Sequence, residues 1–124
     1  MWWGLGDDAF GNTNSGLYDL FLVNYNSSGV KQWTQQLGIS LSDDGQGVTV
    51  DSSNNIYVTG YTEGGLDNNT NSGDKDMFLV KYNSSGTKQW TQQLGTSSEE
   101  YGQSVTVDSS DNIYVTGYTS GGLD

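Results

Sequence analysis

The sequence contains no cysteine, histidine, arginine or proline. These absences exclude disulfides, thiolate and imidazole metal sites, histidine-based triads and guanidinium clamps, and no segment resembles a proline-rich linker. Hydrophobic residues are also few, at 32% of the 124 residues, against roughly 45–50% in an average globular chain when glycine is counted as apolar. We therefore expect a hydrophobic core that is thin or shared.

Positive charge is scarce, because four lysines stand against fifteen acidic residues and the net charge is -11. Such a chain repels a phosphate backbone, which excludes nucleic acid as a partner. The first residues lack the basic and apolar regions of a signal peptide, and no apolar run is long enough to cross a bilayer. We expect a soluble chain that does not contact a membrane, in a compartment that stays unknown.

An internal repeat dominates the sequence, since residues 68–124 match residues 11–67 at 43 of 57 positions. A period of tens of residues is typical of solenoids, propellers and arrays, in which one unit buries its apolar surface against a copy of itself. We therefore divide the chain into an irregular or truncated-repeat segment (1–10) and two propeller repeats (11–67 and 68–124).

Each repeat is expected to contain four strands. In the second copy, apolar and polar residues alternate over 76–83, 87–95, 102–108 and 112–119, as they do in strands. Short turns rich in Asn, Asp, Ser and Gly join these segments into hairpins. A four-stranded antiparallel meander of this kind is the content of one propeller blade, which predicts an all-β fold.

Two stretches carry a family resemblance, VTVDSSDNIYVTGYTSGGLD (105–124) and DMFLVKYNSSGTKQW (76–90). They resemble the bacterial beta-propeller repeat called SBBP, and the resemblance extends over residues 11–124. It implies a β-propeller with no shared enzymatic activity. Many members look like surface or secreted bacterial proteins, which implies a parent protein of that kind.

The order of the predicted strands places half a blade on each side of a whole one. An outer hairpin (21–37) precedes a complete blade (46–94), and an inner hairpin (105–118) follows it. Pairing of the last hairpin of one chain with the first hairpin of the next would give each chain two blades. Propellers usually have about 4 to 8 blades, so we expect a ring closed by homo-oligomerisation. A trimer with six blades or a tetramer with eight is favoured, and a dimer with four blades also falls within this range.

Apolar residues of the two hairpins are expected to hold this assembly together. They are Phe21, Val23, Trp33, Val105, Val107, Ile113 and Val115. Two alternatives are a fragment of a longer propeller with no function of its own and an open head-to-tail filament.

The aromatic residues leave open another function, a multivalent carbohydrate-binding propeller, and a protein ligand also stays open. The residues that could stack on sugars are Tyr25, Trp33, Tyr57, Tyr61, Tyr82, Trp90, Tyr114 and Tyr118. Core packing is the simpler role for rings at strand spacing, above all for Trp33 and Trp90.

Paired acids are the only candidates for catalysis, at Asp7-Asp8, Asp43-Asp44 and Glu99-Glu100. Glycoside hydrolysis needs two carboxylates facing each other across a cleft, whereas neighbours on a strand point apart. We therefore expect solvated loop acids and no enzymatic activity.

One loop offers oxygen ligands for Ca²⁺, at Asp67, Asn69, Asn71, Asp74 and Asp76. Alternating acidic and amide side chains suit this ion. The match to an EF-hand is partial, because Gly73 comes one place late and Phe78 stands where the bidentate acid belongs. An Asn- and Gly-rich turn bonded to its own backbone is the simpler interpretation, and no other cofactor is expected.

Overall fold

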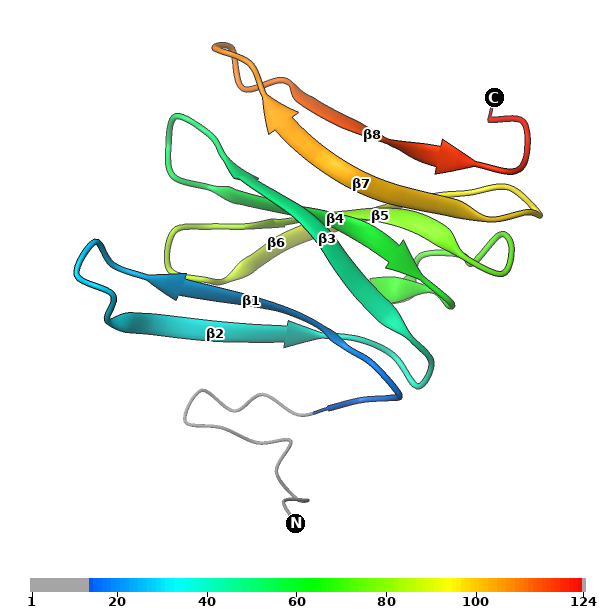
Figure 1. Cartoon of the computed structure of the whole chain (residues 1–124), viewed down its shortest axis with the longest axis horizontal. Helices are drawn as coiled ribbons and strands as arrows, with labels where there is room; N and C mark the ends of the chain where they lie inside the picture. The colour runs from blue at the N-terminus through cyan, green and yellow to red at the C-terminus, as the bar shows by residue number, and fades with distance from the viewer. Residues whose placement is uncertain (1–13, 124) are drawn as a thin grey trace.

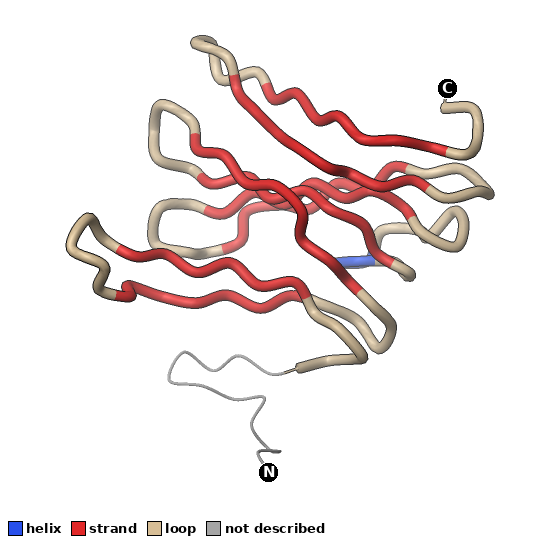
Figure 2. The backbone as a smooth tube through the Cα atoms, in the orientation of Figure 1, coloured by secondary structure: helices blue, strands red, loops and turns tan. Residues whose placement is uncertain are grey.

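In the computed structural model, which describes residues 14–123, the regular secondary structure consists almost entirely of antiparallel strands (Figure 1). The eight strands are β1 (Leu20–Tyr25), β2 (Lys31–Leu37), β3 (Asp43–Val50), β4 (Ile56–Thr62), β5 (Asp76–Tyr82), β6 (Lys88–Leu94), β7 (Glu100–Val107) and β8 (Ile113–Thr119). One 3-10 turn, η1 (Leu66–Asn68), lies in the connection from β4 to β5 (Figure 2). The predicted segment 1–10, with Asp7-Asp8, lies outside the described residues.

These strands form three sheets of two, four and two strands. The middle sheet is the meander β3–β4–β5–β6, and the hairpins β1–β2 and β7–β8 lie on either side of it (Figure 1). The order hairpin, blade, hairpin is therefore confirmed. The strand limits differ slightly, because β3 already begins at Asp43 and β7 at Glu100. Within the described residues the sheets do not close into a ring.

The hydrophobic core lies between the hairpin β1–β2 and the middle sheet. Its buried members are Leu20, Trp33, Ile56, Val58, Leu66, Phe78, Val80 and Tyr82. Alternate residues of β5 point into this core, as the sequence predicted for Phe78, Val80 and Tyr82. Along β4 almost every side chain is buried, because the other face of the sheet is covered as well.

The hairpin β7–β8 covers that other face at close range. A Cβ at Gly47 would lie 3.0 Å from both the Gln103 carbonyl oxygen and the Ser104 Cα. Glycine therefore lets the backbones of β3 and β7 approach each other directly. Beside this contact, the rings of Tyr61 and Tyr101 meet edge to face with centroids 4.8 Å apart, a favourable geometry for aromatic pairs.

The turns follow the chemistry of their residues. In the predicted turn from Asn83 to Gly86, the Asn83 side-chain oxygen accepts hydrogen bonds from the backbone N–H groups of Ser85 and Thr87 at 3.0 and 2.9 Å. Gly86 has a φ of 83°, in the left-handed region that glycine reaches without steric cost. The turn therefore has the predicted form.

Candidate interaction surface

Strands β1 and β8 each have one edge that no strand covers within residues 14–123. When the two repeats are aligned in sequence, 57 residues apart, β1 corresponds to β5 and β8 corresponds to β4. In the middle sheet β4 and β5 pair with each other along their whole length, from Ile56 opposite Tyr82 to Thr62 opposite Asp76. Each hairpin therefore corresponds to one half of the complete blade. The edge that it exposes corresponds to the edge at which β4 and β5 pair in that blade.

The repeat gives each exposed side chain a counterpart, 57 residues away, whose surroundings can be compared with its own. Four apolar or aromatic side chains are mostly exposed where the counterpart is buried: Phe21 (68%) against Phe78 (0%), Tyr25 (60%) against Tyr82 (2%), Val48 (57%) against Val105 (6%), and Tyr114 (56%) against Tyr57 (2%). The residue types are identical within each pair. The difference therefore comes from what lies beside the side chain.

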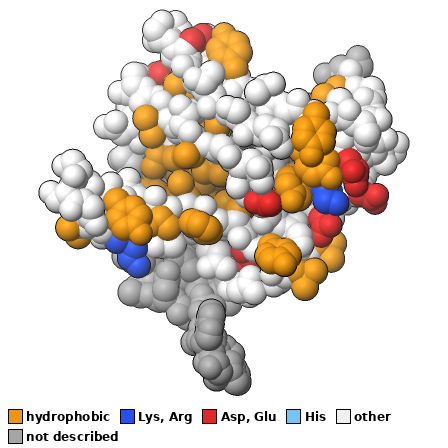
Figure 3. All heavy atoms as spheres, in the orientation of Figure 1, with side chains coloured by type: hydrophobic (Ala, Val, Ile, Leu, Met, Phe, Trp, Pro, Cys, Tyr) orange, Lys and Arg blue, Asp and Glu red, His pale blue; other side chains and the backbone are white. Residues whose placement is uncertain are grey.

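Two grooves accompany these residues. One of about 280 Å³ runs between β1 and β3 and is lined by Phe21, Val23, Val48 and Val58. The other, of about 270 Å³, lies between the middle sheet and β8, with Met77, Leu94 and Tyr118 among its lining residues. Figure 3 shows hydrophobic side chains gathered in the hollow between the hairpin β1–β2 and the middle sheet. Both grooves lie where a complete blade would have further strands.

A tryptophan forms a second contact between successive sheets. The Trp33 indole N–H donates to the Ser84 carbonyl at 3.3 Å, and a Cβ at Gly86 would come within 2.7 Å of the Trp33 ring. The counterpart of this turn is the turn at Gly29, where no other described residue comes within 4 Å of a Cβ. Trp90, the counterpart of Trp33, is half-buried and packs against Tyr57, with the two ring centroids 6.1 Å apart.

The residues predicted to hold copies together divide into three groups. Trp33 and Val105 are already buried within the chain, at its two internal sheet contacts, so their burial needs no second copy. Phe21 is mostly exposed. The remaining four, Val23, Val107, Ile113 and Val115, are half-buried. A role in assembly stays a prediction. Phe21 and the four half-buried residues are better candidates for it than Trp33 and Val105.

In the two acidic pairs within the described residues, one acid of each pair is buried, whereas the sequence predicted acids solvated in loops. Asp43 and Glu100 begin β3 and β7 and are 1% and 2% exposed. Asp43 accepts a hydrogen bond from the Thr62 hydroxyl, and Glu100 accepts one from the Thr119 hydroxyl at 2.8 Å. Their sequence neighbours Asp44 and Glu99 are half-buried and accept hydrogen bonds from Tyr61 and Tyr101 instead. The buried acids thus tie the first strand of a blade to the end of the second.

The pKa values of the two buried acids are shifted in opposite directions. Burial raises the pKa of Asp43, and the nearby acids Asp19 and Glu63 act in the same direction, against hydrogen bonds from Thr62 and Ile39. Burial also acts to raise the pKa of Glu100, but hydrogen bonds from Thr96 and Thr119 outweigh it, so this pKa is lowered.

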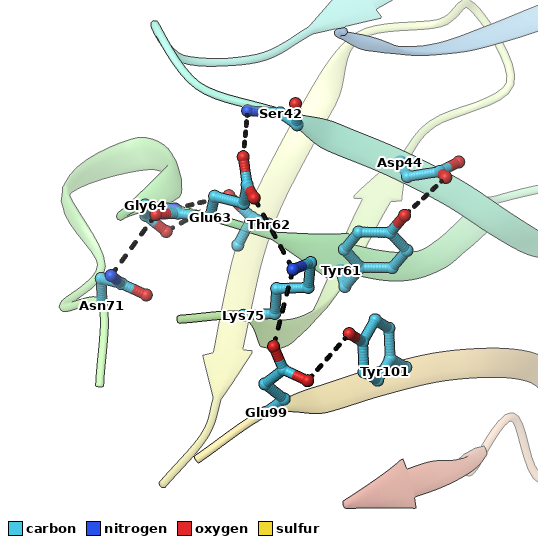
Figure 4. A network of polar contacts seen from close by, with 10 residues as sticks. All are labelled: Ser42, Asp44, Tyr61, Thr62, Glu63, Gly64, Asn71, Lys75, Glu99 and Tyr101. Carbon is cyan, nitrogen blue, oxygen red and sulfur yellow. Dashed lines mark hydrogen bonds and ion pairs between the residues drawn. The ribbon is translucent and has the colours of Figure 1, made fainter. Parts of the chain in front are cut away.

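A small ionic network links the middle sheet to β7 (Figure 4). The Lys75 ammonium lies 3.7 Å from the Glu63 carboxylate and 3.6 Å from the Glu99 carboxylate. Glu99 also accepts a hydrogen bond from the Tyr101 hydroxyl at 3.1 Å, and the Tyr61 hydroxyl donates to Asp44 at 3.0 Å. One lysine therefore bridges an acid from each of two sheets.

The predicted calcium loop holds its acids apart. Asp67 is bonded to Lys88 at 2.6 Å and to the Thr91 hydroxyl. Asp76 is buried and accepts the backbone N–H groups of Ser72 and Gly73. Asn69 and Asn71 donate to backbone carbonyls, and Asp74 is exposed.

Among residues 14–123 no group of three or more acidic side chains is arranged to hold an ion. Calcium binding at this loop stays a prediction, which calorimetric titration of the chain with calcium would test.

The loop between β3 and β4 is hydrogen-bonded to the loop between β7 and β8. Ser52 donates from its hydroxyl to Asp111 at 2.8 Å and from its backbone N–H at 3.2 Å. In the first of these loops, burial acts to raise the pKa of Asp51, but hydrogen bonds from Asn55, Tyr57 and Ser53 lower it to about 2. Burial, followed by the bond to Asp51, raises the pKa of Tyr57 to about 12.

The aromatic residues are mostly structural within the described chain. Tyr57 and Tyr82 are buried, and the Tyr101 and Tyr118 rings stack with centroids 4.5 Å apart. Tyr25, Tyr114 and Tyr118 are exposed, but they come from the uncovered hairpins, and their counterparts in the complete blade are buried or half-buried. Carbohydrate binding stays a prediction.

Sequence reasoning missed two structural features of this surface. It did not find the pairing of Asp43 with Thr62, because the two residues are 19 positions apart and nothing in the local pattern marks them. It also missed the contact between Trp33 and the turn at Gly86, although the unvaried NSSG and QWTQQL segments in both repeats were a usable signal.

Comparison with known proteins agrees with this architecture. The family described as Beta-propeller repeat (SBBP) matches residues 32–67 and 89–124, more than half of the chain. The chain is also 32% identical over 126 residues to an uncharacterized WD repeat-containing protein, L264, of Acanthamoeba polyphaga mimivirus. That alignment covers 88% of this chain and 9% of the viral protein. No helix among the described residues is long and apolar enough to cross a membrane. Because the family model matches once in each of the two repeats, and each repeat has the sequence of four strands, this chain belongs to the beta-propeller repeat family.

Proposed function

We propose that this chain is a non-enzymatic scaffold module whose copies assemble into a β-propeller by completing each other's half-blades. The observation that carries the proposal is the contrast between identical residues, such as Phe21 and Phe78, of which one is exposed and the other fully buried. Full burial of a side chain of this size contributes roughly 1.5–3 kcal/mol. The uncovered edges thus have both hydrogen-bonding groups and apolar surface to offer a partner.

A second copy is the occupant that fits. The hairpin β7–β8 has the sequence of the first half of a blade, and β1–β2 that of the second half, so each copy offers what the other lacks. Two blade equivalents per chain make the number of blades even. Three copies would give six blades and four copies would give eight, both within the usual range of about 4 to 8.

The absence of an enzymatic role is part of this proposal. Two nearly identical repeats produce similar surfaces twice, whereas catalysis needs one asymmetric cleft. The acids that could have served in hydrolysis, Asp43 and Glu100, accept hydrogen bonds from threonines within their own blades. Their contacts support a structural role.

Electron microscopy of the purified chain in negative stain tests the proposal. We expect closed rings with a sixfold or eightfold arrangement of blades. Open filaments would show that copies join without closing, which would refute the ring. Particles of single-chain size at micromolar concentration would refute assembly altogether.

A further inference from the structure

We propose that the shared blade has a single defined register, in which β8 of one copy pairs with β1 of the next so that Val115 lies opposite Val23. We call this contact between two copies the joint. In the same joint, Trp90 of the first copy packs on the turn at Gly29 of the next. This inference rests on the assembly proposed above and specifies the partner surface residue by residue.

The register comes from the complete blade. There Val58 of β4 lies opposite Val80 of β5, Gly60 opposite Phe78 and Ile56 opposite Tyr82. Transferred by one repeat, these pairs become Val115 with Val23, Gly117 with Phe21 and Ile113 with Tyr25. A slip of one residue would turn every side chain of one strand to the opposite face.

The side-chain faces agree with this register. In the described chain, Phe78 and Leu20 are buried in the same core, and Leu37 packs against this core. The counterparts of Leu20 and Leu37 are Met77 and Leu94, which line the groove of about 270 Å³. Phe21 of the next copy would therefore enter this groove as Phe78 enters the core.

The tryptophan contact has its template in the same chain. Trp33, on the outer strand of one sheet, donates to Ser84 and covers Gly86 of the following sheet. Trp90 is on the outer strand of the middle sheet, so the following turn is the one at Gly29 of the next copy. Gly29 has a φ of 78°, close to the 83° of Gly86, and its Cβ position is open among the described residues.

Charge supports the same fit. Within the chain, Lys75 bridges Glu63 and Glu99 across a sheet contact. At the joint, the three counterpart residues are all uncharged: Tyr18, Ser120 and Ser42. All three members of the network change together, so the joint leaves no lysine or glutamate without its partner. A buried charge without a partner would disfavour the contact strongly.

Cysteine crosslinking tests the register, because the natural chain has no cysteine. The double variant Val23→Cys/Val115→Cys is oxidised at the concentration where the chain assembles and is analysed without reducing agent. We expect disulfide-linked species of two or more chains. Val58→Cys/Val80→Cys is the matched control, since the same geometry within one chain gives a disulfide without a change in mass.

A register-shifted variant, Val23→Cys/Thr116→Cys, separates this inference from assembly itself. We expect little crosslinking, because a shift of one residue places the two side chains on opposite faces. Crosslinking of this variant at least as strong as that of Val23→Cys/Val115→Cys, in particles of unchanged native mass, would overturn the register and leave assembly standing. A chain that stays monomeric would overturn both.

Trp90→Ala provides a readout that does not depend on new cysteines. Truncation of a central interface tryptophan commonly weakens binding by about tenfold or more, and we expect at least this increase in the dissociation constant from a light-scattering dilution series. Gln89→Ala, at an exposed neighbouring position, is the control. An unchanged dissociation constant for Trp90→Ala would overturn the tryptophan contact.

Discussion

The Trp33 indole covers Gly86 so closely that a Cβ on this glycine would come within 2.7 Å of the ring. The contact joins the hairpin β1–β2 to the middle sheet and is repeated in sequence, but not in the described surroundings, at Trp90 and Gly29. Comparison of such counterparts separates what folding of the chain requires from what assembly requires.

The glycine pair gives the first prediction. Gly86→Ala and Gly29→Ala impose similar backbone strain, roughly 1–2 kcal/mol, because both positions have a positive φ. Gly86→Ala also pushes Trp33 away, so we expect it to lower the free energy of unfolding more than Gly29→Ala does. Urea denaturation at low chain concentration measures the difference. Equal losses would mean that the Trp33 contact contributes no stability.

Phe78 and Phe21 form a second matched pair. Phe78→Ala leaves a cavity in the core and should lower the free energy of unfolding by roughly 3–5 kcal/mol. Phe21→Ala should cost the isolated chain little, because the side chain is mostly exposed, yet it should impair assembly. Urea denaturation and light scattering on both variants check this. A large loss of stability for Phe21→Ala under conditions where the chain is monomeric would contradict the assignment of Phe21 to the joint.

The buried acid Glu100 should matter more than the half-buried ion pairs of Lys75. Glu100→Gln removes the charged acceptor of the Thr96 and Thr119 hydrogen bonds, and we expect a loss of about 1–3 kcal/mol in the free energy of unfolding. Lys75→Met should cost about 1 kcal/mol or less, and less still in high salt. Thermal or urea unfolding of both variants tests the order, and a reversed order would refute it.

Acid should destabilise the chain through Asp51. Its pKa is about 2 in the folded chain, below the usual 3.8. A lowered pKa stabilises the folded state above the unfolded value, and this contribution is lost as the pH falls from about 4 to about 2. We expect urea midpoints to fall over this range and Asp51→Asn to flatten the dependence. Asp74→Asn, which changes an exposed acid, should leave the slope intact.

Much of the fold could be predicted from the sequence because its signals are local. Alternation in DMFLVKY placed Phe78, Val80 and Tyr82 on one face, and the NSSG turns fixed where hairpins reverse. The repeat itself then placed half-blades on either side of a blade, an arrangement that follows from the order of strands alone.

The surroundings of individual side chains could not be predicted in the same way. Asp43 appeared as a loop acid because its burial depends on Thr62, which only the pairing of β3 with β4 brings near. Trp33 and Val105 were assigned to contacts between copies, and the sequence did not show that both are already buried within the single chain. Such positions depend on how sheets stack, and sheet stacking leaves no periodic trace in the sequence.

The native mass in solution tests the central claim most directly, by light scattering on a sizing column over a range of concentrations. For a chain of 13.4 kDa, the account predicts a particle of about 40 kDa for three copies or about 54 kDa for four. A folded species that stays at 13.4 kDa at every concentration would contradict it, because the exposed edges of β1 and β8 would then need no second copy.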